Sequence, residues 1–171
     1  MKKIVQICLF MVLAVVLSFG TATAQKIGYT NSLALLSEMS AVKQANARLE
    51  AFEKQLSKQG EAMVTKLQNK FQDAQDKQRK GELTATQVAA IETELKQEQI
   101  EIQKFGVKAE EDLAKKRSEL FAPILDKVTE AIKAVAEEND YAYIFDAGTN
   151  GILYAEETTD VTELVKAKLT L

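Results

Sequence analysis

The sequence contains no histidine and no tryptophan, and it has one cysteine and one proline among 171 residues. Without histidine the chain lacks the usual general base and a common zinc ligand, which argues against most hydrolytic and metal-dependent enzymes. A single cysteine can form neither an intramolecular disulfide nor a CxxC redox pair. One proline and seven glycines are too few for collagen, long linkers or an all-β fold with many turns. The composition therefore predicts a mostly helical protein that is not an enzyme.

The known catalytic and ligand-binding motifs are also missing. The sequence has no phosphate-binding loop, GxSxG, HExxH or EF-hand motif. Neighbouring carboxylates occur at 110–112, 137–138 and 156–157, but adjacent residues on a helix point apart, so we interpret them as solvated. We predict no catalytic residue, no cofactor and no metal site. Nucleic acid binding is disfavoured because the net charge is −3 and no groove-like pattern of aromatic and basic residues occurs.

The first 24 residues have the three-part pattern of a secretory signal peptide. Residues 1–3 are positively charged, residues 4–19 are almost entirely apolar, and residues 20–24 are small and end in Ala-Thr-Ala. The apolar run is shorter than the roughly 20 residues that a membrane-spanning helix needs, which disfavours the alternative of a retained anchor. We expect cleavage after Ala24, which would export a chain of 147 residues and remove Cys8.

Residues 31–138 carry the pattern of two long helices. Asn31 is a candidate N-cap, and apolar residues three or four positions apart then continue to Lys80 as one narrow stripe, interrupted at Gln59. Thr84 and Gln87 have the spacing of a capping box, so we expect a second helix over residues 84–138. With a turn near 81–83, the pattern predicts an antiparallel coiled-coil hairpin whose helices are roughly 75–80 Å long.

The second predicted helix, residues 84–138, also carries a stripe of apolar residues three or four positions apart, and it contains one proline. Gln99 lies on the stripe, so this seam is also imperfect. Pro123 removes one helical hydrogen bond, and we predict a kink there. The alternative is a true helix break at Ala122.

The two ends of the exported chain show the period of β-strands. Residues 26–30 alternate apolar with small or polar residues, and apolar residues at 141, 143 and 145 lie on one strand face. Turn residues at 148–151 followed by 152–154 predict a β-hairpin. Residues 160–163 resemble a helix cap, which would open a short helix with Leu164, Val165 and Leu169 on its apolar side.

These end segments are too small to form an independent core. Residues 25–30 and 139–171 amount to 39 residues, which bury little apolar surface. We therefore expect a discontinuous β body, formed by these two segments, that several chains share. The predicted fold class is α+β, mostly α, with residues 31–138 as a long arm on this body.

Charge is distributed unevenly along the chain. Residues 137–163 contain eight acidic residues and no basic one. Near the turn, five basic residues outnumber Asp73 and Asp76, and these five are Lys66, Lys70, Lys77, Arg79 and Lys80. They are either an ordinary solvated helix surface or a contact site at the arm tip for anionic partners or lipid head groups. Large apolar residues of the arm are likewise either seam residues or contacts for unfolded chains; these are Phe52, Met63, Phe71, Phe105 and Phe121.

Two patterns in the end segments carry a family likeness. They are residues 26–31 with Leu35, and residues 143–146, 153–154 and 160–162 with Val165. In these patterns the sequence resembles the Skp/OmpH family of periplasmic chaperones. The resemblance implies a periplasmic homotrimer, shaped like a jellyfish, whose arms enclose unfolded outer-membrane β-barrel proteins without ATP. Some family members are strongly basic, whereas this chain is acidic, so no lipopolysaccharide-binding cluster is carried over. Thr30 stands where members of the family often have an apolar residue, a small difference that weakens one strand contact at most.

Two functions follow as hypotheses. The first is an ATP-independent holdase that binds clients over a diffuse arm surface, with transient contact to membrane lipid as a further possibility. The alternative is a structural or scaffolding coiled coil of the cell envelope, for which a perfect heptad seam is expected.

Overall fold

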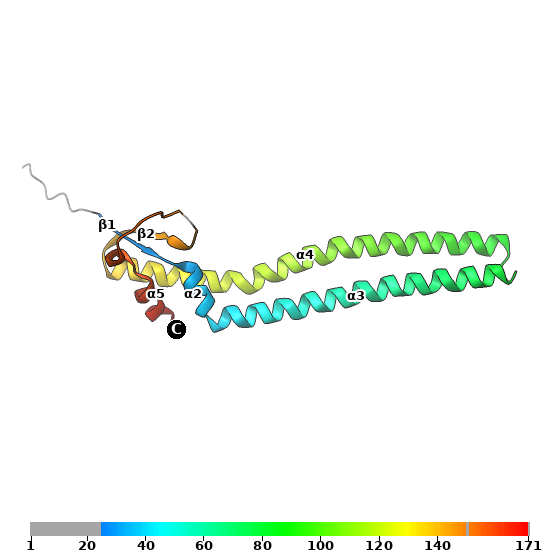
Figure 1. The fold of residues 1–171 in the computed structure, drawn as a ribbon, viewed down its shortest axis with the longest axis horizontal. Coiled ribbons are helices and arrows are strands. Elements are labelled where there is room, and N and C mark those ends of the chain that lie inside the picture. The colour runs from blue at the N-terminus through cyan, green and yellow to red at the C-terminus, as the bar shows by residue number, and fades with distance from the viewer. Residues whose placement is uncertain (1–24, 150, 171) are drawn as a thin grey trace, which may run out of the picture.

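The fold is a long helical arm on a small body (Figure 1). The structure, a computed structural model, describes residues 25–149 and 151–170. The predicted signal peptide, residues 1–24, lies outside the described residues. The described chain is mostly helical with one two-stranded sheet, which confirms the predicted α+β, mostly-α class.

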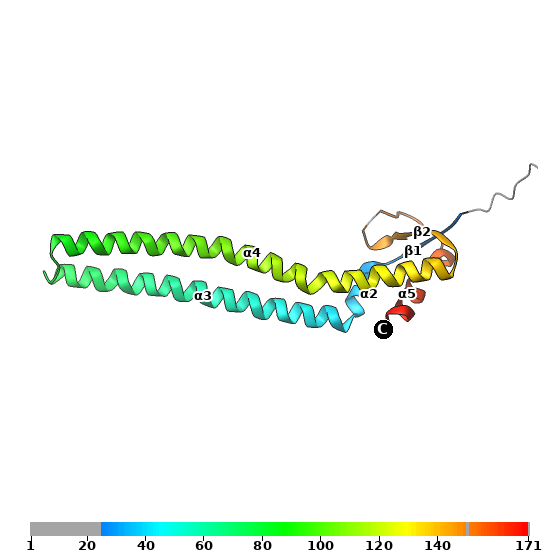
Figure 2. The same cartoon turned by 180° about the vertical axis from the view of Figure 1, so that it is seen from behind.

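The arm consists of α3 (Ser40–Arg79) and the larger, first part of α4 (Ala85–Glu138), which run antiparallel side by side (Figures 1 and 2); the end of α4 lies in the body. The predicted capping box at the start of α4 is confirmed: the Gln87 backbone N–H donates to Thr84 Oγ1 at 3.3 Å, and the Thr84 N–H donates to Gln87 Oε1 at 2.8 Å. Gly81, in the turn, has φ +72°, a conformation that glycine adopts without a steric penalty.

The prediction of one unbroken helix from residue 31 to residue 80 is wrong. Asn31 is an N-cap as predicted, with its Oδ1 accepting from the Ala34 N–H at 3.0 Å, but it caps a short helix, α2 (Ser32–Glu38). Met39 has an extended backbone, with φ −64° and ψ 122°, and α3 begins at the next residue. The break keeps Leu35 and Met39 buried in the body while α3 leaves along α4 (Figure 1). Tertiary packing therefore overrides the helical periodicity.

The helix α4 passes through Pro123 without interruption, so the alternative of a helix break at Ala122 is wrong. Ile124 and Val128, just beyond the proline, are buried in the core of the body. Their burial outweighs the hydrogen bond that proline removes. The ribbon of α4 bends between the arm and the body (Figure 1), as expected of a helix that contains proline.

The sheet pairs the two ends of the chain, and the predicted β-hairpin is wrong. The strand β1 (Lys26–Thr30) pairs in parallel with β2 (Tyr141–Asp146), so the whole arm is the crossover between them. Residues 152–154 form no strand in the described chain, and Leu153 and Tyr154 are 99% and 84% exposed. On its other edge, β1 is flanked by residues 160–161. Tyr29 forms a bridge with Asp160, and the Val161 N–H donates to Tyr29 O at 2.8 Å.

The last helix, α5 (Thr162–Leu169), lies where the sequence predicts a short closing helix. Val161 and Val165 are fully buried and Leu169 is partly buried, whereas Leu164 is exposed, so its predicted inward position is wrong. Val161 and Val165 are four residues apart and share one face, and Leu164 is turned about 100° from Val165. The core of the body thus gathers residues from α2, α4 and α5.

Candidate functional site: the distal arm

Four of the five basic residues predicted at the arm tip lie in the structure beside acidic partners. Lys70 Nζ is 2.7 Å from Glu94 Oε2 and 3.1 Å from Glu98 Oε1, and Lys66 Nζ is 3.5 Å from Glu98 Oε1. Nearer the turn, Lys77 pairs with Asp73 at 2.7 Å, and Arg79 pairs with Asp76. Among the described residues, Lys80 alone of the five has no ion pair.

The hydrogen bonds between α3 and α4 shift the pKa values of this cluster. The pKa of Lys70 is raised above 10.5, chiefly by its hydrogen bonds with Glu94 and Glu98. The pKa of Glu98 is lowered below 4.5, chiefly by its hydrogen bond with Lys70. Both shifts keep the cluster charged, so the pairing joins the two helices across the whole neutral pH range.

The positive charge near the turn is balanced when both helices are considered. Residues 66–98 carry six basic and six acidic side chains, because α4 contributes acidic residues that lie far from the lysines in sequence. A neutral surface exerts little long-range attraction on anions. The charge balance therefore does not support contact between the five basic residues and anionic partners or lipid, and this contact stays a prediction.

Helical geometry places the ionic cluster on one side of the hairpin. Successive residues are turned by about 100°, so Lys66 and Gln68 project to opposite sides of Leu67. In the same way, Glu94 and Lys96 project to opposite sides of Leu95. Lys66 and Glu94 project to the same side of the hairpin, where they lie with Lys70 and Glu98. We call this the ionic side, defined by these four residues.

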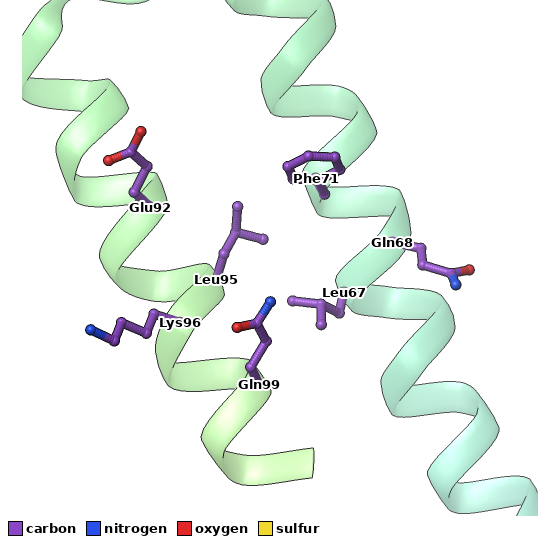
Figure 3. Close-up of a pocket in the computed structure, with 7 residues that line it drawn as sticks. All are labelled: Leu67, Gln68, Phe71, Glu92, Leu95, Lys96 and Gln99. Atoms are coloured by element: carbon purple, nitrogen blue, oxygen red, sulfur yellow. The ribbon is translucent and has the colours of Figure 1, made fainter. Parts of the chain in front are cut away.

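The other side carries an apolar groove between α3 and α4 (Figure 3). This distal groove has a volume of about 530 Å³ and is lined by Leu67, Gln68, Phe71, Glu92, Leu95, Lys96 and Gln99. Leu67 and Leu95 point toward each other across the groove, Gln99 points into the space between the helices, and Gln68 and Lys96 point outward (Figure 3). A smaller groove continues toward the turn and shares Phe71, Glu92 and Leu95.

Phe71 behaves differently from the other large apolar residues of the arm. The side chains of Phe52, Met63, Phe105 and Phe121 are partly buried along the hairpin, in agreement with the seam interpretation. Phe105 lies beside Gly60, with its ring 3.4 Å from the position that a Cβ on Gly60 would occupy. Phe71 is 50% exposed at the rim of the distal groove, so it is available to a partner.

Of the two glutamines predicted on the seam, Gln59 lies outside it, whereas Gln99 points between the helices at the groove. Gln59 is exposed, and Gly60 faces α4 instead. Gln99 is exposed at the groove, and Glu98 faces the seam. Sequence reasoning missed Glu94 and Glu98 as partners of Lys66 and Lys70. The acidic spacing of 94 and 98 on α4 was visible, but pairing it with particular lysines requires the register of the hairpin.

Within residues 25–149 and 151–170, no group of three or more metal-ligating side chains comes together. Over the same part of the chain, no helix combines the length and the apolar character of a bilayer span.

The sequence matches a known protein family over most of its length. The model of the family described as outer membrane protein (OmpH-like) matches residues 26–169. The chain belongs to the OmpH-like family. This match covers both end segments and the arm, and it confirms the resemblance that the end segments indicate.

The fold of this OmpH-like chain is shared with a solved structure. A crystal structure of a protein assigned as an outer membrane chaperone (OmpH-like), from Caulobacter crescentus CB15, matches with a TM-score of 0.72. The match covers 88% of each chain at 16% sequence identity, which establishes a common fold. Among curated proteins, none matches the chain.

Proposed function

We propose that this OmpH-like chain is a periplasmic chaperone that holds unfolded outer-membrane proteins and prevents their aggregation without ATP. The observation that carries the proposal is the arm, which leaves large apolar side chains exposed along its length, including Phe71, Ile100 and Val107. Ile100 and Val107 lie on one surface of α4, and exposed apolar side chains that gather on one surface mark contacts with partners. Membership in the OmpH-like family supports the same role.

The loose construction of the arm suits a binder of varied clients. Between residues 46 and 123 no side chain is fully buried, because two helices cannot enclose a core. A segment with so few buried contacts has low local stability, so the arm can adjust its shape to different unfolded chains. Many weak contacts spread over an arm then give affinity without a precise pocket.

We further propose that the body assembles as the homotrimer expected from the family resemblance. Tyr143 and Phe145 are half exposed on one face of the sheet, with ring centroids 6.3 Å apart. In the described chain the edge of β2 opposite β1 has no strand beside it. Leu153 and Tyr154, predicted as a strand and left exposed, supply a segment that can pair with the sheet of another copy.

Replacing Leu153 with asparagine and Tyr154 with serine is expected to weaken this self-association at least about tenfold, because burying two large apolar side chains contributes several kcal/mol. Sedimentation equilibrium over a range of concentrations measures the effect. The matched control replaces two exposed apolar residues of the arm, Ile100 and Val107, with serine, and it should leave the association constant unchanged. If the variant at Leu153 and Tyr154 stays a trimer at every concentration, as the control does, residues 153–154 are not part of the interface.

The chaperone role is tested with the chain from Gln25 onward. A urea-unfolded outer-membrane protein is diluted into buffer with and without the chain, and light scattering is followed in the absence of nucleotide. We expect suppression near one trimer per client. Unchanged scattering at severalfold excess of folded protein would contradict the holdase role for that client and favour the scaffolding alternative, in which the arm tips bind a fixed envelope partner.

A further inference from the structure

We infer that the distal groove is a docking site for an extended polypeptide segment, one of whose apolar side chains inserts between Leu67, Phe71 and Leu95. The inference rests on the proposed chaperone function and assigns its client contact to one side of the arm. The groove side differs from the ionic side in chemistry, although both lie at the same level of the same hairpin.

The shape of the groove fits an extended chain. Together with its continuation toward the turn, the groove follows α3 from residue 67 to residue 78. That length is about 16 Å along a helix and equals about five residues of a β-strand. A globular ligand would need a deeper enclosure, whereas this track is open along its length.

The polar residues of the groove fit a peptide backbone. Gln99 points into the main groove and Gln68 lies at its outer edge, while Gln75 and Gln78 border its continuation. In the described part of the chain, none of these four side-chain amides has a hydrogen-bond partner. Each amide offers a donor and an acceptor, which is the complement of a peptide group.

The charge of the groove disfavours an anionic lipid surface as its occupant. Its lining has one acidic and one basic residue, Glu92 and Lys96, so it carries no net charge. Binding to anionic head groups requires an excess of cations. Strands of outer-membrane proteins alternate apolar and polar residues, so an unfolded strand can direct its apolar side chains into the groove and its polar ones to water.

The affinity test compares two exposed apolar residues of the arm. Phe71→Gln removes the half-exposed ring at the groove, and Val107→Gln removes a 61% exposed side chain of α4 outside the groove. We expect Phe71→Gln to raise the Kd for a urea-unfolded outer-membrane protein about three- to tenfold, with a smaller change for Val107→Gln. Circular dichroism of both variants verifies the helical content. If wild type binds and both variants lose affinity equally, the groove inference is overturned while the chaperone function stands. If wild type does not bind, both fail.

A crosslinking test separates the two sides of the arm directly. A benzophenone amino acid is placed at position 68 on the groove side or at position 66 on the ionic side, one residue to either side of Leu67. We expect the client to crosslink severalfold more strongly from position 68 than from position 66. Equal yields, or a crosslink from position 68 to a second copy of the chain without client, would overturn the inference. Crosslinking of position 68 to vesicles of anionic phospholipid in place of the client would do the same.

Discussion

Replacing Leu35 with alanine is expected to lower the free energy of unfolding of the body by about 2–5 kcal/mol, the usual cost of a cavity at a buried leucine. Leu35 lies in α2, is 1% exposed, and belongs to the same core cluster as Val135 and Val165. The core of this body is small, so a loss of that size is a large part of its total stability.

The chain offers a matched control and a local probe for this prediction. Leu33, two residues away in α2, is 60% exposed, and Leu33→Ala should change stability by no more than about 0.5 kcal/mol. All four tyrosines lie in the body, at positions 29, 141, 143 and 154, and the chain has no tryptophan. Tyrosine fluorescence in a urea titration at fixed protein concentration therefore reports the body, while far-UV circular dichroism reports mainly the arm. Equal destabilisation by both substitutions would show that α2 does not pack through Leu35.

The features that the sequence predicted correctly depend on nearby residues. The Thr84 and Gln87 pair caps α4 because both partners lie within one turn, and Asn31 caps α2 for the same reason. The stripes of α3 and α4 repeat over many turns, which makes a helical hairpin the simplest way to bury them. Such local signals do not require knowledge of the rest of the fold.

The features that were predicted wrongly depend on residues far apart in sequence. The strand β2 pairs with β1, more than 100 residues earlier, and not with residues 152–154. Both pairings satisfy the same alternating pattern, so periodicity cannot choose between them. Met39 ends α2 because Leu35 and Met39 are both held in the body, a constraint that the helical spacing does not contain.

The distal arm shows the same division. Sequence spacing found Lys66 and Lys70 and identified a local excess of positive charge. Glu94 and Glu98 meet these lysines only in the register that the hairpin adopts, and that pairing removes the excess. The arm has one ionic and one apolar side, and this difference emerges only when α3 and α4 are placed side by side; Figure 3 shows the apolar side.

The carboxylate of Asp146, at the end of β2, holds the start of α2 in place. Its Oδ1 accepts from the Ser32 N–H at 3.1 Å and from the Gly148 N–H at 2.9 Å, and its Oδ2 accepts from Ser32 Oγ at 2.6 Å. One side chain thus connects the two ends of the chain, 114 residues apart in sequence. A carboxylate at a helix N-terminus also interacts favourably with the helix dipole.

Asp146→Ala is therefore expected to destabilise the body by about 1.5–3 kcal/mol at neutral pH, because it removes hydrogen bonds to a charged group. Asp146→Asn, which keeps an acceptor oxygen without the charge, should cost less. Urea titrations followed by tyrosine fluorescence measure both losses.

The contribution of Asp146 should also depend on pH. Partial burial raises the pKa of Asp146, but hydrogen bonds from Ser32 and Gly148 outweigh that effect and hold the pKa below its ordinary value of 3.8. A carboxyl group whose pKa is lower in the folded state stabilises the fold above the unfolded pKa and loses that contribution as the pH falls through the folded pKa. Wild type should therefore lose stability relative to both variants as the pH falls below about 3.8, so that the difference between wild type and Asp146→Asn shrinks. A difference that stays constant from pH 7 to pH 2.5 would mean that the hydrogen bonds of Asp146 do not favour its charged form.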